Sequence, residues 1–271
     1  MYPSRYNDDH EMTRFFAFQF ISGAEVTADV DWNIKSESID ADGIIYGIIP
    51  ESETKLKELA RIIKDTSVGN DRLIFVLPKH YRDIDAVTQE YAAVTKLRDR
   101  AIDDPVLFDE YEVVFEDLQE IIKGFIGSYT HPESYRSVYI HNGDELHVRR
   151  KSGLTEVMSR ICDEVYSLTP VINNESVNKN DITSIAQNSR NKIVGALLRS
   201  ELEPNLGLSG TGQDVSIMRS TLLRTGIWNE VGGVAQINLR PEDESMRNML
   251  ETIENFILEA RHNGRISFAM L

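Results

Sequence analysis

The polar stretch that follows Leu168 has the most distinctive spacing of chemically capable residues in the chain. Residues 168–180 read LTPVINNESVNKN, so that four asparagines and one glutamate fall within eight positions. An asparagine amide donates and accepts hydrogen bonds at once, so such a run can lock an irregular backbone and cap a helix. We expect Asn180 or Asp181 to cap the next helix. The run is then either a structural scaffold or a sensor of a neighbouring domain.

A phosphate-binding loop would be the most direct sign of nucleotide chemistry, and the chain has none. Such a loop needs GxxxxGK followed by Ser or Thr, because its amides cradle the phosphates, its lysine neutralises them and its hydroxyl holds Mg²⁺. The nearest sequence, GLSGTG at Gly207–Gly212, has neither the lysine nor a preceding strand. We interpret it as a flexible connection and expect no cofactor in this chain, ATP included.

The carboxylates, histidines and cysteine form no recognisable catalytic or metal-binding pattern. The acidic residues between 109 and 120 fall on the polar face of an amphipathic helix, where solvation accounts for them. His141 and His147 lie across an expected hairpin, but no thiol and no third ligand accompanies them. The single cysteine, Cys162, lies on the apolar side of a helical pattern and is expected in the core. We predict no catalytic residue and no metal site.

The net charge of −15 is unevenly distributed along the chain. Residues 1–135 hold 14 basic and 27 acidic residues, whereas residues 136–271 hold 15 and 17. Because phosphate contacts dominate the binding of duplex DNA, the acidic first half is a poor nucleic-acid surface. The nearly neutral second half has room for a basic patch. The candidates for contact with nucleic acid are Arg149, Arg150, Lys151 and Lys192.

The hydrophobic pattern predicts an α/β first half. The runs GIIYGII at 43–49 and LIFVL at 73–77 are continuous and apolar, as in buried strands. Residues 51–64 between them have apolar side chains at helical spacing. A strand, helix and strand of this length form a βαβ unit, whose crossover implies parallel pairing. With a further strand at 14–21, we expect a small, partly parallel sheet covered by helices.

Two long helices should follow this sheet. The segment 83–100 is one, and the second begins at Pro105, with Asp103 or Asp104 in position to cap it. Apolar residues recur along the second helix at steps of three and four, which predicts one continuous apolar stripe. We place the break between two domains shortly after this helix, with a small α/β domain at 1–130.

The second domain, residues 136–271, is expected to open with a β-hairpin and to be mainly helical. Asn142 and Gly143 supply the positive φ angles of a two-residue turn, which predicts a hairpin over 137–148. The polar or glycine-rich segments Glu203–Asp214 and Glu230–Glu242 read as linkers. We place the helices near 153–167, 181–201, 214–226 and 243–263.

The ends of the chain and its composition give further expectations. No apolar run approaches the roughly 20 residues of a membrane helix, and the polar, acidic N-terminus is no signal peptide. The single cysteine fits a reducing cytoplasm. The last residues, GRISFAML, form an apolar run that stops abruptly. They indicate either a fragment of a longer protein or a terminal strand docked in a sheet.

Three segments together give a family resemblance. TPVINNESVNKN at 169–180, SRNKIV at 189–194 and DVSIMRSTLLRTGIW at 214–228 resemble the large P-loop ATPases of bacterial phage-defence islands, namely the BREX ATP-binding proteins and their PglY-like relatives. The resemblance covers roughly residues 40–271. Its matching positions are Pro170, Asn174, Glu175, Asn178, Arg190, Asp214, Leu222, Leu223 and Gly226.

This resemblance implies a non-catalytic segment beyond the nucleotide-binding core of such an ATPase. ATP and Mg²⁺ would then belong to the parent protein, and the partners would be its upstream nucleotide-binding domain or other subunits of a defence complex. The segment would couple or join these parts. The candidate interface residues are Asn174, Glu175, Asn178 and Arg190.

Two alternatives remain open at this point. The first is a DNA-contacting module of the winged-helix type, because a hairpin beside helices is compatible with that fold. The second is a metal-dependent nuclease whose carboxylates come from distant parts of the chain. The acidic composition permits the second alternative, although no spacing selects it.

Overall fold

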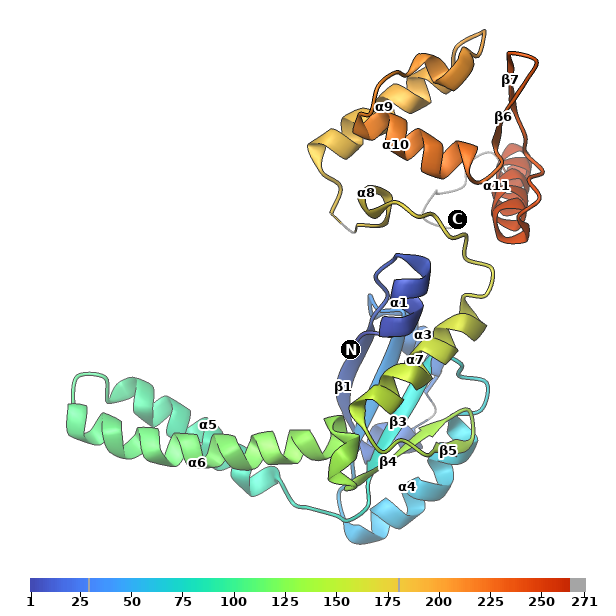
Figure 1. Cartoon of the computed structure of the whole chain (residues 1–271). Helices are drawn as coiled ribbons and strands as arrows, with labels where there is room; N and C mark the ends of the chain where they lie inside the picture. The colour runs from blue at the N-terminus through green and yellow to red at the C-terminus, as the bar shows by residue number, and fades with distance from the viewer. Residues whose placement is uncertain (29, 180, 264–271) are drawn as a thin grey trace. The chain divides into compact units, whose positions relative to one another are not determined.

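The computed structural model describes residues 1–28, 30–179 and 181–263, and it confirms the α/β class (Figure 1). The chain divides into two compact units, each described here by itself. The first consists of Met1–Pro3 and Arg14–Ile161, and the second of Ser4–Thr13 and Cys162–Leu271. Within the described residues, no helix has the length and hydrophobicity needed to cross a membrane.

A five-stranded sheet with the order β1-β2-β3-β4-β5 forms the centre of the first unit. The first three strands are parallel, and β4 and β5 continue the sheet in antiparallel fashion. Helix α4 connects β2 to β3, so the predicted βαβ unit is confirmed. The bounds are Phe16–Ser22 for β1, Gly43–Ile49 for β2, Glu53–Thr66 for α4, Leu73–Pro78 for β3, Ser137–His141 for β4 and Asp144–Leu146 for β5.

Continuous apolar strands explain why the centre of the sheet is buried. All residues of β2 except the last are buried. On one face, the Trp32 ring lies edge-on to Tyr46 and Phe75, at centroid distances of 5.4 and 5.1 Å. Leu59 and Ile63 of α4 pack into the same cluster. Short helices α2 (Gly23–Thr27) and α3 (Trp32–Glu37) link β1 to β2.

A close approach of two strands fixes the start of β2. Gly43 is paired with Phe16 of β1. A Cβ atom at Gly43 would lie 2.2 Å from the Phe16 ring, which is buried and therefore has little room to move. Only glycine fits at this position.

Helices α5 (Asp85–Arg100) and α6 (Pro105–Thr130) form an antiparallel pair that projects from the sheet (Figure 1), and we call this pair the arm. The side chain of Asp104 accepts a hydrogen bond from the Leu107 N–H at 3.2 Å, so one of the two predicted caps is confirmed. The C-terminal end of α6 packs against β3 and a short 3₁₀ turn, η1 (Pro132–Ser134).

The predicted hairpin over 137–148 is confirmed as β4 and β5. Asn142 and Gly143 at its turn have φ angles of 47° and 86°. This hairpin was expected at the head of the second domain, but β4 pairs with β3 and extends the sheet of the first unit. The exposed edge of β3 therefore gains a hydrogen-bonding partner.

The second unit is built mainly from helices. Helix α7 runs from the first unit into the second, and Cys162 near its end is fully buried, as predicted. A core cluster that includes Met218 and Trp228 joins α9, α10 and the following hairpin. The helices are α1 (Ser4–His10), α7 (Lys151–Val165), α8 (Glu175–Asn178), α9 (Ser184–Leu197), η2 (Pro204–Gly207), α10 (Gln213–Met218), a π-helical turn η3 (Arg219–Leu223) and α11 (Glu244–Asn263).

Two expectations for the second unit are wrong. The cap of α9 is Thr183, whose hydroxyl accepts from the Ala186 N–H at 3.2 Å, and Asp181 lies outside the helix. The other expected cap, Asn180, and the C-terminal run GRISFAML lie outside the described residues. The expected linker after Glu230 contains a second hairpin, formed by β6 (Trp228–Val231) and β7 (Val234–Ile237).

Candidate functional site

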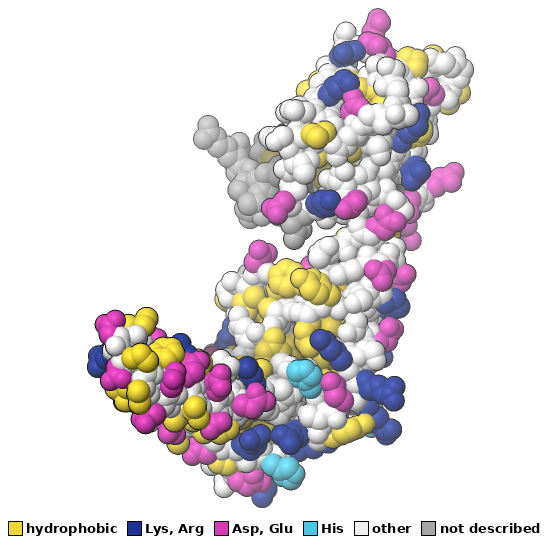
Figure 2. Space-filling model, turned by 60° about the vertical axis from the view of Figure 1, so that its left-hand side comes forward, with side chains coloured by type: hydrophobic (Ala, Val, Ile, Leu, Met, Phe, Trp, Pro, Cys, Tyr) yellow, Lys and Arg dark blue, Asp and Glu magenta, His cyan; other side chains and the backbone are white. Residues whose placement is uncertain are grey.

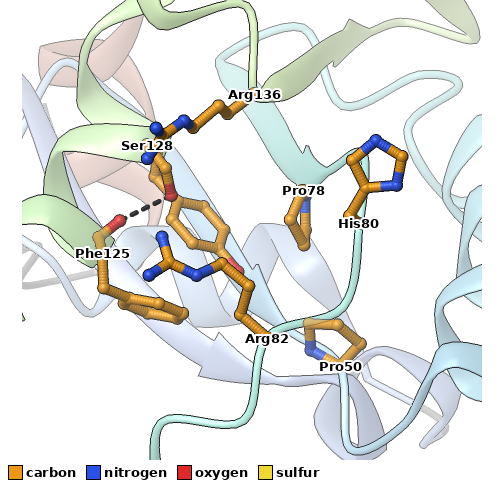
Figure 3. A pocket seen from close by; sticks show the side chains of 8 residues that line it. Pro50, Pro78, His80, Arg82, Phe125, Ser128 and Arg136 are labelled. Atoms are coloured by element: carbon orange, nitrogen blue, oxygen red, sulfur yellow. Dashed lines mark hydrogen bonds between the residues drawn. The ribbon is translucent and has the colours of Figure 1, made fainter.

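A pocket of about 330 Å³ lies where β2 and β3 end, beside the base of the arm (Figure 3). The carboxyl edge of parallel strands is the usual place for ligands in open α/β sheets, because the loops that leave the strands diverge there. The lining residues are Pro50, Pro78, His80, Arg82, Phe125, Ser128, Tyr129 and Arg136.

Two prolines explain why the pocket opens at this place. Pro50 directly follows β2, and Pro78 is the last residue of β3. Proline has no N–H to continue a ladder, so both strands end together and their connections turn away. The N–H of Lys79 donates to the carbonyl of Arg136 at 2.8 Å, which holds the segment after β3 against the segment before β4.

Buried tyrosines make the wall of the pocket rigid. The Tyr129 hydroxyl donates to the carbonyl of Ile48 at 3.0 Å, and the Tyr139 hydroxyl donates to the carbonyl of Tyr129 at 2.7 Å. Burial raises the pKa of both phenols well above the ordinary value. These hydroxyls therefore stay protonated at neutral pH and act as hydrogen-bond donors, not as general bases.

Two arginines and one histidine line the opening of the pocket. The guanidinium groups of Arg82 and Arg136 point toward Ser128, and His80 lies on the other side of the opening, beyond Pro78 (Figure 3). All three of these side chains are exposed. Neither arginine forms an ion pair with any carboxylate of the described residues. The arrangement can attract and orient an anion.

The predicted asparagine run forms a hydrogen-bond network in the second unit. Asn174 caps α8 by accepting from the Ser176 N–H at 3.0 Å, and its amide donates to the Ser220 hydroxyl at 2.9 Å. Asn178 donates to the carbonyls of Ile172 and Glu11, at 2.7 and 2.6 Å. These bonds hold an irregular segment to η3 and to the N-terminal residues of the same unit.

The charged candidates Glu175, Arg190 and Lys192 make contacts of their own, and none of them forms a hydrogen bond given above for Asn174 or Asn178. Glu175 pairs with Lys179 at 2.7 Å, and this hydrogen bond lowers the pKa of the Glu175 carboxyl. Arg190 lines a mainly apolar pocket of about 320 Å³ between α9 and α10. Lys192 pairs with Asp214. The ammonium group of Lys192 is therefore already neutralised by a carboxylate.

The remaining basic candidates lie together in the first unit. Arg149 and Arg150 directly precede α7, and Lys151 is its first residue. All three are exposed, and they lie in a different unit from Lys192. Three of the four residues proposed for nucleic-acid contact are thus simply consecutive in the chain, and the fourth belongs to the other unit.

Metal ligands do not gather anywhere in the described part of the chain. No group of three or more His, Cys, Asp or Glu side chains in those residues is placed to hold an ion. His141, one half of the histidine pair considered above, lies with its Nδ1 atom 2.8 Å from the carbonyl oxygen of Leu73.

Sequence reasoning missed the pocket residues because four separate segments supply them. His80 and Arg82 belong to the connection from β3 to α5, whereas Arg136 precedes β4. The available signal was the proline at the end of two adjacent buried strands, at positions 50 and 78. Comparison of the chain with protein-family models, curated proteins and solved structures gives no match.

Proposed function

We propose that this chain is a non-catalytic interaction segment that docks a partner through the arm. The observation that carries this proposal is a stripe of exposed apolar residues along α6, flanked by carboxylates. On the face of the arm visible in Figure 2, hydrophobic and acidic side chains alternate. A solvated helix has no need of such a stripe, whereas a helix that receives a partner does.

The stripe has the spacing of a helix–helix seam. Val106 and Val113 are seven residues apart and are 72% and 61% exposed. Leu107, Val114 and Ile121 repeat at the same interval beside them and are also exposed. A seven-residue repeat keeps apolar side chains in line along a second helix. The stripe therefore fits an elongated helical partner.

The arm already has its own internal seam, so this stripe is additional. The rings of Tyr91 in α5 and Phe115 in α6 stack at a centroid distance of 5.0 Å. Arg98 lies over Phe115 at 4.0 Å and pairs with Glu112 at 3.0 Å. These contacts hold the two helices together without using the exposed stripe.

The net charge of the arm indicates which kind of partner helix fits it. Residues 85–130 contain 11 acidic and 4 basic residues, a net charge of −7. Two copies of the arm would bring like charges together, whereas a basic amphipathic helix would meet complementary charge. The occupant that fits is therefore a partner helix with an apolar stripe flanked by lysine or arginine.

The family resemblance suggests where such docking would be used. In a large ATPase of the phage-defence type, a segment without a phosphate-binding loop would join subunits or relay the nucleotide state of the core. ATP and Mg²⁺ would remain with the nucleotide-binding domain. The arm would supply the joining surface of that assembly.

A helical peptide of about four heptads, with leucine in the seam and lysine on the flanks, tests the docking surface. We expect it to bind the whole chain, and we expect added salt to weaken binding. Val113→Glu should weaken it by about tenfold, since it places another negative charge in an apolar seam. Fluorescence anisotropy measures the affinity.

Val231→Glu is the matched control, because Val231 is 66% exposed and lies at the tip of the β6–β7 hairpin in the second unit. It should leave peptide binding unchanged. Equal binding of a glutamate-flanked peptide would refute the charge argument. An unchanged affinity in Val113→Glu would refute the proposed surface.

A second candidate function is contact of the second unit with DNA. The observation that favours it is the β6–β7 hairpin, which directly follows the helical segment formed by α10 and η3, as a wing follows a recognition helix. Arg219, the first residue of η3, and Arg224, which follows η3, are exposed and line a polar pocket with Asn173. These two arginines were not among the residues predicted from the sequence.

Gel shifts of the whole chain on a mixed-sequence duplex, at several salt concentrations, test this second candidate. Arg219→Gln should reduce the slope of log affinity against log salt by about 1, as expected for one lost phosphate contact. Arg199→Gln is the control, because Arg199 already pairs with Glu203 at 2.6 Å. Absence of any shift at low salt would remove this candidate.

A further inference from the structure

We infer that the pocket at the carboxyl edge of β2 and β3 binds a small phosphate ester whose organic part is a flat, apolar ring. This site is separate from the exposed stripe of the arm and goes beyond the proposed docking function. Arg82 and Arg136 would hold the phosphate, and Phe125 and Tyr129 would contact the ring.

The charges around the pocket favour an anionic ligand. The chain carries a net charge of −15, yet the two arginines at this opening lack a carboxylate partner among the described residues. Three acidic side chains near this edge of the sheet already accept hydrogen bonds from backbone N–H groups. Glu51 accepts from the Ala24 N–H at 2.8 Å, Glu53 from the Tyr81 N–H at 3.2 Å, and Asp83 from the Asp85 N–H at 2.9 Å.

The hydrogen-bond donors of the two arginines are suited to a phosphate group. A guanidinium group presents several N–H donors in a rigid plane and pairs with phosphate oxygens in bidentate fashion. The two groups point to the same side of the opening (Figure 3). Both arginines are therefore available to an anion bound in this pocket. His80 on the opposite side adds a further nitrogen that can contact a hydroxyl or a phosphate oxygen.

The shape and size of the pocket indicate the organic part of the ligand. Pro50, Pro78, Phe125 and Tyr129 give the pocket an apolar lining beneath its charged opening. Small-molecule sites usually combine such a lining with a few placed polar groups, and their volumes begin near 300 Å³. At about 330 Å³, this pocket accommodates one phosphate and one ring but not an extended polyphosphate. A monoester with an aromatic group is the best match.

The pocket is positioned at the base of the arm. Arg82 lies on the connection that leads into α5, and Tyr129 lies near the end of α6, so both ends of the arm contribute to the pocket. Arg136 belongs to the segment that precedes β4. A bound phosphate would connect the entry to the arm with the sheet. Ligand binding should therefore reduce hydrogen exchange in the connection from β3 to α5.

Titration calorimetry of the whole chain with inorganic phosphate and with phenyl phosphate tests the inference. Phenyl phosphate should bind about tenfold more tightly than inorganic phosphate, because it also buries a ring. Arg82→Gln and Arg136→Gln should each weaken the binding of phenyl phosphate by about tenfold or more, which is the usual effect of losing a charged hydrogen-bond donor. Arg61→Gln, an exposed arginine on α4 outside the pocket, should have no effect.

Chemical modification of arginines in the wild-type chain tests the same site and does not depend on the folding of any variant. Phenylglyoxal modifies exposed arginines, and phenyl phosphate should protect Arg82 and Arg136 in the wild-type chain while Arg61 still reacts. Mass spectrometry reads the modified positions. No binding of either probe, or an equal loss in Arg61→Gln, would overturn the inference. Equal affinity for the two probes would overturn the aromatic part of the ligand assignment.

Discussion

The Tyr129 hydroxyl donates a hydrogen bond of 3.0 Å to the carbonyl oxygen of Ile48, and this bond ties the base of the arm to β2, an interior strand of the sheet. A second buried phenol provides a contrast. The Tyr46 hydroxyl is buried in the core and makes no hydrogen bond with any of the described residues. The two tyrosines differ in what their hydroxyl groups contribute.

Removing each hydroxyl should therefore have opposite effects. Tyr129→Phe should lower the free energy of unfolding by about 1 kcal/mol, the usual net value of a hydrogen bond. Tyr46→Phe should leave the free energy unchanged or raise it by up to about 1 kcal/mol, because it removes an unpaired buried group. Urea unfolding at equilibrium measures both, and an equal loss in the two variants would contradict the assignment.

Two glycines should respond in opposite ways to alanine. Gly43→Ala should cost about 1–3 kcal/mol, because the added methyl group collides with the buried Phe16 ring. Gly124→Ala should stabilise the chain by up to about 1 kcal/mol, because alanine favours a helix. No atom of the described residues beyond the adjoining helix backbone lies within 4 Å of a Cβ atom placed at Gly124, so the methyl group has room. Thermal unfolding measures the stability of both variants. A Gly43→Ala protein as stable as the wild type would contradict the close approach of the two strands.

The cation of Arg98 should couple to both of its partners in the arm. Arg98→Ala should cost about 1–2 kcal/mol, because it removes the contact with the Phe115 ring and the ion pair with Glu112. A double-mutant cycle with Glu112→Gln separates the two contributions. Hydrogen exchange in α5 provides the readout, and full additivity of the two mutations would argue against the ion pair.

The ion pair between Lys192 and Asp214 should make stability sensitive to acid. The hydrogen bond from Lys192, followed by that from the Val215 N–H, lowers the pKa of the Asp214 carboxyl. A lowered carboxyl pKa gives stability that is present above the unfolded value, about 3.9, and is lost as the pH falls through the folded value. Asp214→Asn should therefore be less stable than the wild type at pH 7, and this difference should shrink below pH ~4.

Unfolding measured from neutral to acidic pH checks this expectation. Glu201→Gln is a suitable control, because Glu201 is exposed and forms no ion pair within the described residues. A difference between Asp214→Asn and wild type that stayed constant down to the lowest pH would count against the pairing.

The elements predicted well were those whose signal is local. The apolar runs at 43–49 and 73–77 each have the length of a strand, and the turn at Asn142 and Gly143 needs positive φ angles that these residues adopt readily. The hairpin after Glu230 was missed because its strands are only four residues long and mostly exposed. Little hydrophobic periodicity survives in such strands.

Other features depend on geometry that a sequence does not contain. Thr183 and Asp181 are both good helix caps, and only the backbone course decides which one is used. The pocket depends on Arg82 and Arg136 meeting beside two strand ends, although they come from distant segments. The asparagine run was recognisable as a hydrogen-bonding segment, but its partners, such as Ser220, become apparent only in the folded chain.

The order of strands in the first unit matches their order along the chain, so each strand pairs with the one made just before it. During synthesis on the ribosome, β2 can pair with β1 as soon as it emerges, and no strand has to wait for a later one to be inserted between its neighbours. The sheet can thus assemble progressively from its N-terminal edge, which limits the time for which the apolar strands β2 and β3 remain uncovered in the nascent protein.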